Sequence, residues 1–446
     1  MSSFERLATL SGPQHPIHAI SFSADAKYLA AVGFFGVIVW DLRASADLRT
    51  PIERFEARKE HKFTTSTWLQ FKTDVGISRH VLVIGSLDGQ ITALDLHEGD
   101  GVLQYTRQPA SHTPPEQTVL SLDHCMFGLG RKCRGQIVAS FFDRSVRSWT
   151  LSLNGEFNFV FSMQLKQSFL PKTVRIQHET RNIYVFSSKG GKRVILHPQS
   201  GTIMTSVENG CEDMSYVALD QSNDRFVTCT GDGFQLFRTR NLCHLRTFED
   251  SATPPVHHPC QVAFVEDGRK VVAGTDQGKV LIFDSEAGHL EQTLMYPGSK
   301  MVQTVAACTV SNDHYVAIAG SAAKKTSDVI VWHKKIQLPP SNSTRSVRMQ
   351  NKDPVVFLLH RSTAKLFGYA SICIILAVSA IMILTNWEFE ITVPVIQFFQ
   401  YNVQKWLQQV IRAMSTSQIL PALAQFFETN VLNRLGLQFV NGRTSH

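Results

Sequence analysis

Histidines and cysteines are the residues of this chain whose spacing could support metal chemistry. His257, His258 and Cys260 are ligand types for zinc. A zinc site needs further ligands, and no second cluster lies at ligand spacing. His178-Glu179 begins like the helical motif of zinc proteases, but the second histidine of that motif is missing. The sequence therefore predicts no metal site.

A glycine–lysine spacing is the nearest approach to a phosphate-binding loop. Gly274 is followed by Gly278-Lys279, but the spacing is short and Val280 stands where Ser or Thr should bind magnesium. We expect this segment to be a tight turn between strands. No Gly-x-Ser-x-Gly nucleophile elbow is present either. The sequence thus predicts no catalytic residue and no cofactor.

The elements that would have to position such residues repeat along the first three quarters of the chain. One unit recurs: a strand, a polar turn, an apolar run, a Gly/Asp turn and a strand that closes on an aromatic or aliphatic residue. Seven copies occur, at residues 19–42, 79–96, 135–151, 181–197, 224–238, 268–284 and 313–333. Their closing residues lie 41 to 55 positions apart, and are Trp40, Leu94, Trp149, Leu196, Phe237, Phe283 and Trp332. This period predicts the blades of a β-propeller.

The repeats resemble those of the WD-repeat family. The resemblance rests on Trp40-Asp41, on the degenerate pairs Leu94-Asp95 and Phe283-Asp284, and on the turn aspartates Asp88, Asp143, Asp232 and Asp276. Other blades close without the acid, as at Trp149-Thr150 and Trp332-His333. The family resemblance implies that the aspartates bond neighbouring backbone and hydroxyl groups. It makes Trp40, Asp41, Trp149, Trp332 and the turn aspartates structural blade positions.

The repeat count predicts an all-β, seven-bladed propeller over residues 1–338. A propeller ring must close, and its last blade usually takes a strand from the other end of the chain. Phe4–Leu10 is a strand-like run before the first unit, so we expect it to complete the seventh blade and cover its open edge. An eighth, unrecognised blade is the alternative.

Net charge and cysteine content limit the possible partners of the protein and its cellular compartment. The net charge is +7, of which residues 334–365 carry +6, whereas residues 1–333 are neutral. A neutral repeat region argues against nucleic acid as a partner. The eight cysteines form no Cys-x-x-Cys pair, which is typical of reduced thiols in a cytosolic setting.

An uncharged run at residues 366–384 predicts a single transmembrane helix. Its nineteen residues would span roughly 28 Å as a helix, close to the thickness of the bilayer's hydrocarbon core. A buried helix of a soluble core is the alternative. We expect a basic flexible linker at 339–365 before the helix and an amphipathic helical tail at 385–446 after it.

Basic residues beside this run predict its orientation. Arg361 and Lys365 precede it directly, which places the propeller in the cytosol of a single-pass protein. The endoplasmic reticulum or another internal membrane is the expected location. The basic linker either follows this positive-inside bias alone or also binds anionic lipid.

A propeller without catalytic motifs and with a membrane anchor predicts a tethered scaffold. Its partners would be other proteins, bound through a propeller face, and the lipid bilayer, bound through residues 366–384. The layout also resembles the endoplasmic-reticulum exchange factor for the small GTPase that starts coat-protein-II vesicles. In that family a long loop of the first blade touches the GTPase, and residues 32–36 correspond to it here. A phosphoinositide-binding propeller is a further alternative, for which residues 237–240 are the nearest match.

Overall fold

The structure is a computed structural model that describes most residues between Ser3 and Ile336. Gaps lie at residues 44–50, 52, 57–61, 73–77, 97–102, 106–108, 129–131, 209, 212, 223, 231–232, 250–257, 298–300 and 321–325. The predicted linker, transmembrane helix and tail, with Arg361 and Lys365, lie outside the described residues. Within the described residues, no helix is long and apolar enough to cross a bilayer.

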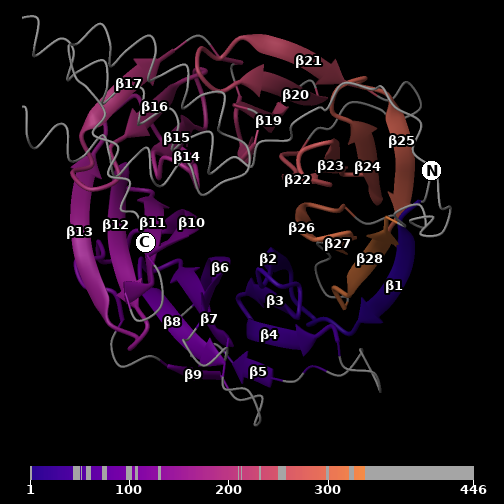
Figure 1. The fold of residues 1–446 in the computed structure, drawn as a ribbon, viewed down its shortest axis with the longest axis horizontal. Coiled ribbons are helices and arrows are strands. Elements are labelled where there is room, and N and C mark those ends of the chain that lie inside the picture. Colours follow the sequence, from indigo (N-terminus) through magenta and orange to yellow (C-terminus); the bar gives the residue numbers. More distant parts are fainter. Residues whose placement is uncertain are drawn as a thin grey trace, which may run out of the picture. The chain divides into compact units, whose positions relative to one another are not determined.

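The described strands form seven four-stranded antiparallel sheets arranged as the blades of a ring (Figure 1). In blades 1 to 6 the four strands follow one another in the chain, from the axis of the ring outwards. Blade 1 contains β2 (Ile17–Phe22), β3 (Tyr28–Gly33), β4 (Gly36–Asp41) and β5 (Glu53–Glu56). Blade 2 contains β6 (Phe63–Lys72), β7 (Ser78–Ser86), β8 (Ile91–Leu96) and β9 (Leu103–Tyr105). Blade 3 contains β10 (Val119–Phe127), β11 (Arg134–Phe141), β12 (Ser145–Ser152) and β13 (Phe157–Gln164).

The remaining blades repeat this order, and only the last one departs from it. Blade 4 contains β14 (Pro171–Ile176), β15 (Ile183–Ser187), β16 (Arg193–Leu196) and β17 (Ile203–Val207). Blade 5 contains β18 (Tyr216–Asp220), β19 (Arg225–Thr230), β20 (Gly233–Arg238) and β21 (His244–Phe248). Blade 6 contains β22 (Val262–Val265), β23 (Lys270–Gly274), β24 (Lys279–Asp284) and β25 (Leu290–Met295). Blade 7 contains β26 (Thr304–Val310), β27 (Asp313–Ala319), β28 (Val329–Lys335) and, outermost, β1 (Glu5–Leu10).

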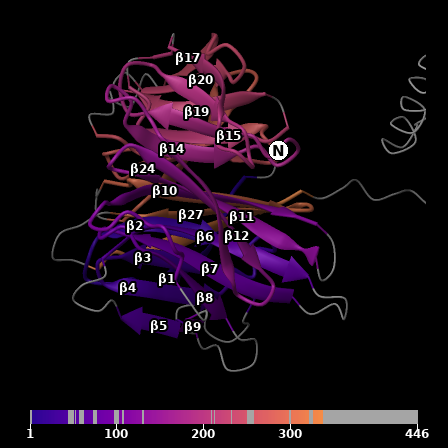
Figure 2. The ribbon, with the colours of Figure 1, turned by 90° about the vertical axis from the view of Figure 1, so that its left-hand side faces the viewer.

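The strand order gives the ring two distinct faces. Each first strand begins, and each second strand ends, at the same edge of its blade. We call this edge the upper face; it carries the turns between second and third strands and the connections between blades. The lower face carries the other two turns of each blade. Seen from the side, the strands run from one face towards the other (Figure 2).

The N-terminal strand closes the ring. β1 pairs antiparallel with β28, from Glu5 opposite His333 to Leu10 opposite Val329. The side chain of Gln292 in blade 6 fixes the chain before β1, because it accepts from the backbone N–H of Phe4 and donates to its carbonyl, both at 2.8 Å. The predicted closure by Phe4–Leu10 is therefore confirmed.

Apolar side chains fill every interface between neighbouring blades. Among the described residues there are seven buried apolar clusters, and each joins two adjacent blades. Between blades 7 and 1, for example, Leu10 and Val331 pack with Trp40. Small residues allow close approach at a few points. Gly89 has φ of 89°, and a Cβ atom there would lie 2.2 Å from the carbonyl oxygen of Pro114 in the connection to blade 3. An all-β, seven-bladed propeller is thus confirmed for the described residues.

Candidate functional site

The residues whose types suggested chemistry lie in turns and in the core. Gly274 ends β23, and Lys279 opens β24 directly after Gly278 of the turn. The hydroxyl of Thr275 closes this turn: it donates to the carbonyl of Lys279 at 2.8 Å and accepts from that residue's N–H. Cys260 is fully buried, and its thiol donates to the carbonyl of His258. His257 lies outside the described residues.

No metal centre is assembled in the part of the chain that the structure covers. There, no group of three or more His, Cys, Asp or Glu side chains could hold an ion. His178 and Glu179 lie in the turn between β14 and β15. Burial raises the pKa of the Cys211 thiol to about 12, and burial raises the pKa of Cys308 to about 12 as well. These two thiols are therefore protonated at neutral pH and are poor nucleophiles or ligands.

The closing residues of the repeats lie on the third strands of the blades. Trp40, Trp149 and the aliphatic and phenylalanine members of the set are buried, whereas Trp332 in blade 7 is only partly buried. In four of the blades the fourth strand carries a bulge opposite the closing residue. These positions therefore pack the ring and face no ligand.

The blade aspartates that the structure describes accept hydrogen bonds within turns. Asp41 accepts from the N–H of Arg43 at 2.8 Å, and Asp143 accepts from the N–H of Ser145 at 2.8 Å. The hydroxyl of Ser86 donates to Asp88. The remaining turn aspartate of blade 6, Asp276, lies in the turn between β23 and β24, and Asp232 of blade 5 lies outside the described residues.

A charged pocket opens on the lower face where blades 6 and 7 meet. Its volume is about 940 Å³. The lining residues are Ser3, Glu5, Arg6, Leu7, Glu266, Arg269, Lys270, Asp284, Glu286, Glu291, His333, Lys334, Lys335 and Ile336. Five are acidic and five are lysine or arginine, so the lining favours neither a cation nor an anion.

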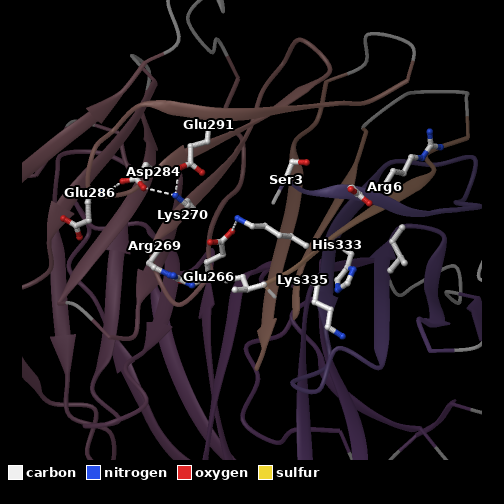
Figure 3. A pocket seen from close by; sticks show the side chains of 14 residues that line it. Ser3, Arg6, Glu266, Arg269, Lys270, Asp284, Glu286, Glu291, His333 and Lys335 are labelled. Carbon is white, nitrogen blue, oxygen red and sulfur yellow. Dashed lines mark hydrogen bonds and ion pairs between the residues drawn. The ribbon is translucent and has the colours of Figure 1, made fainter. Parts of the chain in front are cut away.

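Five of the ten charged residues of this pocket are paired with one another. Lys270 lies between Asp284, at 2.8 Å, and Glu291 (Figure 3). Lys334 of blade 7 pairs with the buried Glu266 of blade 6. Burial alone would raise the pKa of Asp284, but hydrogen bonds from backbone N–H groups and from Lys270 lower that pKa to about 2. We interpret the ion pairs of this pocket as contacts that hold blade 7, which closes the ring, against blade 6.

Three large apolar side chains are exposed on the upper face of blades 1, 2 and 3. Phe34 is 42% exposed, Leu87 41% and Phe142 59%. Each lies in the turn between the second and third strand of its blade. Such a turn needs only small or polar residues. We call these residues the apolar arc.

Two intervening residues, Lys62 and Thr118, connect the members of the apolar arc. The ammonium of Lys62, just before blade 2, lies 5.3 Å from the ring centre of Phe34. Leu87 donates its backbone N–H to the carbonyl of Lys62 at 2.7 Å and accepts at its own carbonyl from the hydroxyl of Thr118 at 3.2 Å. Phe142 in turn donates its N–H to the carbonyl of Thr118 at 3.0 Å. The three turns are therefore linked to one another through Lys62 and Thr118.

The other large exposed apolar residues of the described chain have a different origin. They lie on the outer strands of the ring, and are Leu7, Ile203, Met204, Leu245 and Met295. Three of them, Leu7, Met204 and Leu245, are the extra residues of β-bulges. A bulge on an edge strand hinders pairing with another chain. The exposure of these three therefore accompanies edge protection, and Ile203 and Met295 lie on the same outer strands. We take the apolar arc as the candidate docking surface.

Sequence reasoning predicted docking through a propeller face but did not select these residues. The available signal was a bulky apolar residue within a short Gly/Asp turn, as in Leu87-Asp88-Gly89. Only the ring places three such turns side by side. The fold is compatible with the WD-repeat family and fits a protein-interaction scaffold. The sequence matches neither a model of a known protein family nor a curated protein.

Proposed function

We propose that this protein is a non-catalytic, membrane-tethered scaffold of the WD-repeat type, which binds a protein partner through the upper face of blades 1 to 3. The observation that carries the proposal is the apolar arc: Phe34, Leu87 and Phe142 expose large side chains on adjacent turns of one face. Burying such side chains is the main source of binding energy at protein interfaces.

The path of the chain supports this choice of face. Both Ser3, which precedes β1, and Ile336, which follows β28, lie on the lower face. The first and last described residues of the propeller therefore lie on the face opposite the apolar arc.

Two observations support a cytosolic propeller at the endoplasmic reticulum or another internal membrane. Arg361 and Lys365 flank the apolar run on its N-terminal side. Seven cysteines in the described residues are free of disulfides, among them the exposed Cys243. Free thiols are typical of a reducing compartment.

The exchange-factor and phosphoinositide alternatives gain no support from the described residues. The turn between β3 and β4 consists of Phe34 and Phe35 alone, so no long loop projects from this point of the first blade. Residues 237–240 end β20 and begin the lower turn of blade 5; Phe237 is buried and Arg240 lies 3.6 Å from Asp224.

Proximity labelling by the full chain in cells tests the scaffold proposal. One variant replaces the apolar arc: Phe34→Ser, Leu87→Ser and Phe142→Ser. A matched control replaces rim residues of similar exposure: Met204→Ser, Leu245→Ser and Met295→Ser. We expect the arc variant to lose proteins that the wild type and the rim control both label, with all three chains at equal abundance and melting temperature. Identical labelling by the arc variant and the wild type would refute the proposal.

A further inference from the structure

Lys172 is the second residue of β14, the innermost strand of blade 4, next to the upper face. It stands on a bulge, because the register between β14 and β15 shifts between Pro171 and Thr173. Its ammonium lies 5.2 Å from the ring centre of Tyr216, the first residue of the innermost strand of blade 5. The side chain is partly exposed beside the axis of the ring.

No carboxylate among the described residues pairs with the ammonium of Lys172. Among the described residues its one recorded contact is the cation–π contact with Tyr216, and burial lowers the pKa of Lys172. Burying an ammonium is costly unless an anion compensates. This chain meets that requirement elsewhere, since the largely buried Lys270 and Lys334 both pair with carboxylates. Among the described residues, Lys172 therefore has no carboxylate partner of the kind that Lys270 and Lys334 have.

Further basic side chains lie on the same face. Lys62, Lys166 and Lys189 are exposed on upper-face connections and turns of blades 2 to 4. Two acids of the same region are engaged within the fold: Asp143 lies 3.7 Å from Arg147, and Glu208 lies 3.8 Å from Lys192. Glu116 is exposed before blade 3, and Asp213 is partly exposed in the connection between blades 4 and 5, three residues before Tyr216. Among the described side chains of this region that have no ion-pair partner, the lysines outnumber the acids.

We propose that the segment bound at the apolar arc is acidic, and that one of its Asp or Glu carboxylates pairs with Lys172 beside the axis of the ring. The inference rests on the proposed function and adds the chemistry of the partner: large apolar side chains pack on the arc, and a carboxylate compensates the partly buried ammonium. An extended segment of about twelve residues reaches roughly 40 Å, which suits a surface of several blades.

Fluorescence anisotropy with the purified full chain in detergent tests the pairing. The probes are labelled peptides of about twelve residues with two Phe or Leu residues, in matched sets that carry Glu, Gln or Lys at the remaining variable positions. We expect the Glu set to bind most tightly. Lys172→Met should weaken its binding roughly tenfold to hundredfold, as for a lost hydrogen bond to a charged group. Lys172→Arg should retain most of the affinity, and Lys189→Met, which removes an exposed charge of the same face, should cost far less.

The outcomes separate this inference from the function on which it rests. If the Gln or Lys peptides bind best and depend on Phe34, Leu87 and Phe142 but not on Lys172, the acidic partner is wrong while the docking face stands. If no peptide set depends on the apolar arc, the docking face itself fails. Vesicles with anionic lipid that bind in a Lys172-dependent way, while the Glu peptides do not, would overturn the inference in favour of a membrane surface.

Discussion

Two leucines of the N-terminal strand test how the ring is held closed. Leu10 is completely buried and packs with Trp40, Val329 and Val331 at the interface between blades 7 and 1. Leu7 lies three residues earlier on the same strand, at the bulge, and is 40% exposed. Replacing either leucine by alanine removes the same atoms, but from two different environments.

The expected effects differ several-fold. Truncating a buried leucine costs about 2–5 kcal/mol of unfolding free energy, whereas most surface substitutions stay within about 0.5 kcal/mol. With about 2.1 cal/mol/K of unfolding entropy per residue, a propeller of roughly 330 residues has an unfolding entropy near 0.7 kcal/mol/K. Leu10→Ala should therefore lower the melting temperature by about 3–7 °C, and Leu7→Ala by less than about 1 °C.

Circular dichroism of the detergent-solubilised full chain, followed in the β-sheet band at one scan rate, measures both values. The wild type and both variants are compared side by side. If Leu10→Ala melts with the wild type, or if both variants lose the same amount, β1 does not hold the ring closed as described. Deleting residues 1–10 should lower the melting temperature further than Leu10→Ala, because the deletion also removes the pairing with β28 and the Phe4–Gln292 contacts.

Two further predictions concern the lower face and the topology. The pKa of Asp284 is about 2 in the folded chain, below the ordinary value near 3.9, so its carboxylate stabilises the fold above pH 4 and this contribution is lost between about pH 4 and pH 2. Asp284→Asn should therefore show a shallower fall of melting temperature across that range, and an unchanged slope would contradict this assignment. Protease added to sealed microsomes should digest the propeller and leave a protected fragment of roughly 80 residues, 366–446. A protected propeller would instead place it in the lumen and remove the basis for a cytosolic partner.

The blade count and the closing residues could be read from the sequence because burial imposes them. Each blade must bury one side chain of its third strand, and that demand recurs at Trp40, Leu94 and Trp149 with the period of the fold. Closure through Phe4–Leu10 was predictable from the same count, since the seventh unit lacked an outer strand. Short outer strands such as β17 carry little apolar patterning, so the sequence indicates them only weakly.

The candidate site could not be predicted in the same way. Phe34, Leu87 and Phe142 are far apart in the chain, and each alone is an ordinary exposed apolar residue. Lys172 and Tyr216 meet only because blades 4 and 5 are neighbours in the ring. Such sites form where side chains of different repeats come together, whereas the repeat pattern predicts only the structure within each repeat.

The ring also limits which of its surfaces can serve a partner. On the rim, Leu7, Met204 and Leu245 form bulges in the outer strands. These bulges hinder the pairing of an outer strand with a strand of another chain. On the lower face, Lys270 and Lys334 are already neutralised, so an approaching charged group would have to break existing pairs. On the upper face some charges are paired as well, as in Asp143–Arg147, but three large apolar side chains are exposed and no described carboxylate pairs with Lys172. We therefore expect a partner to gain most binding free energy on the upper face.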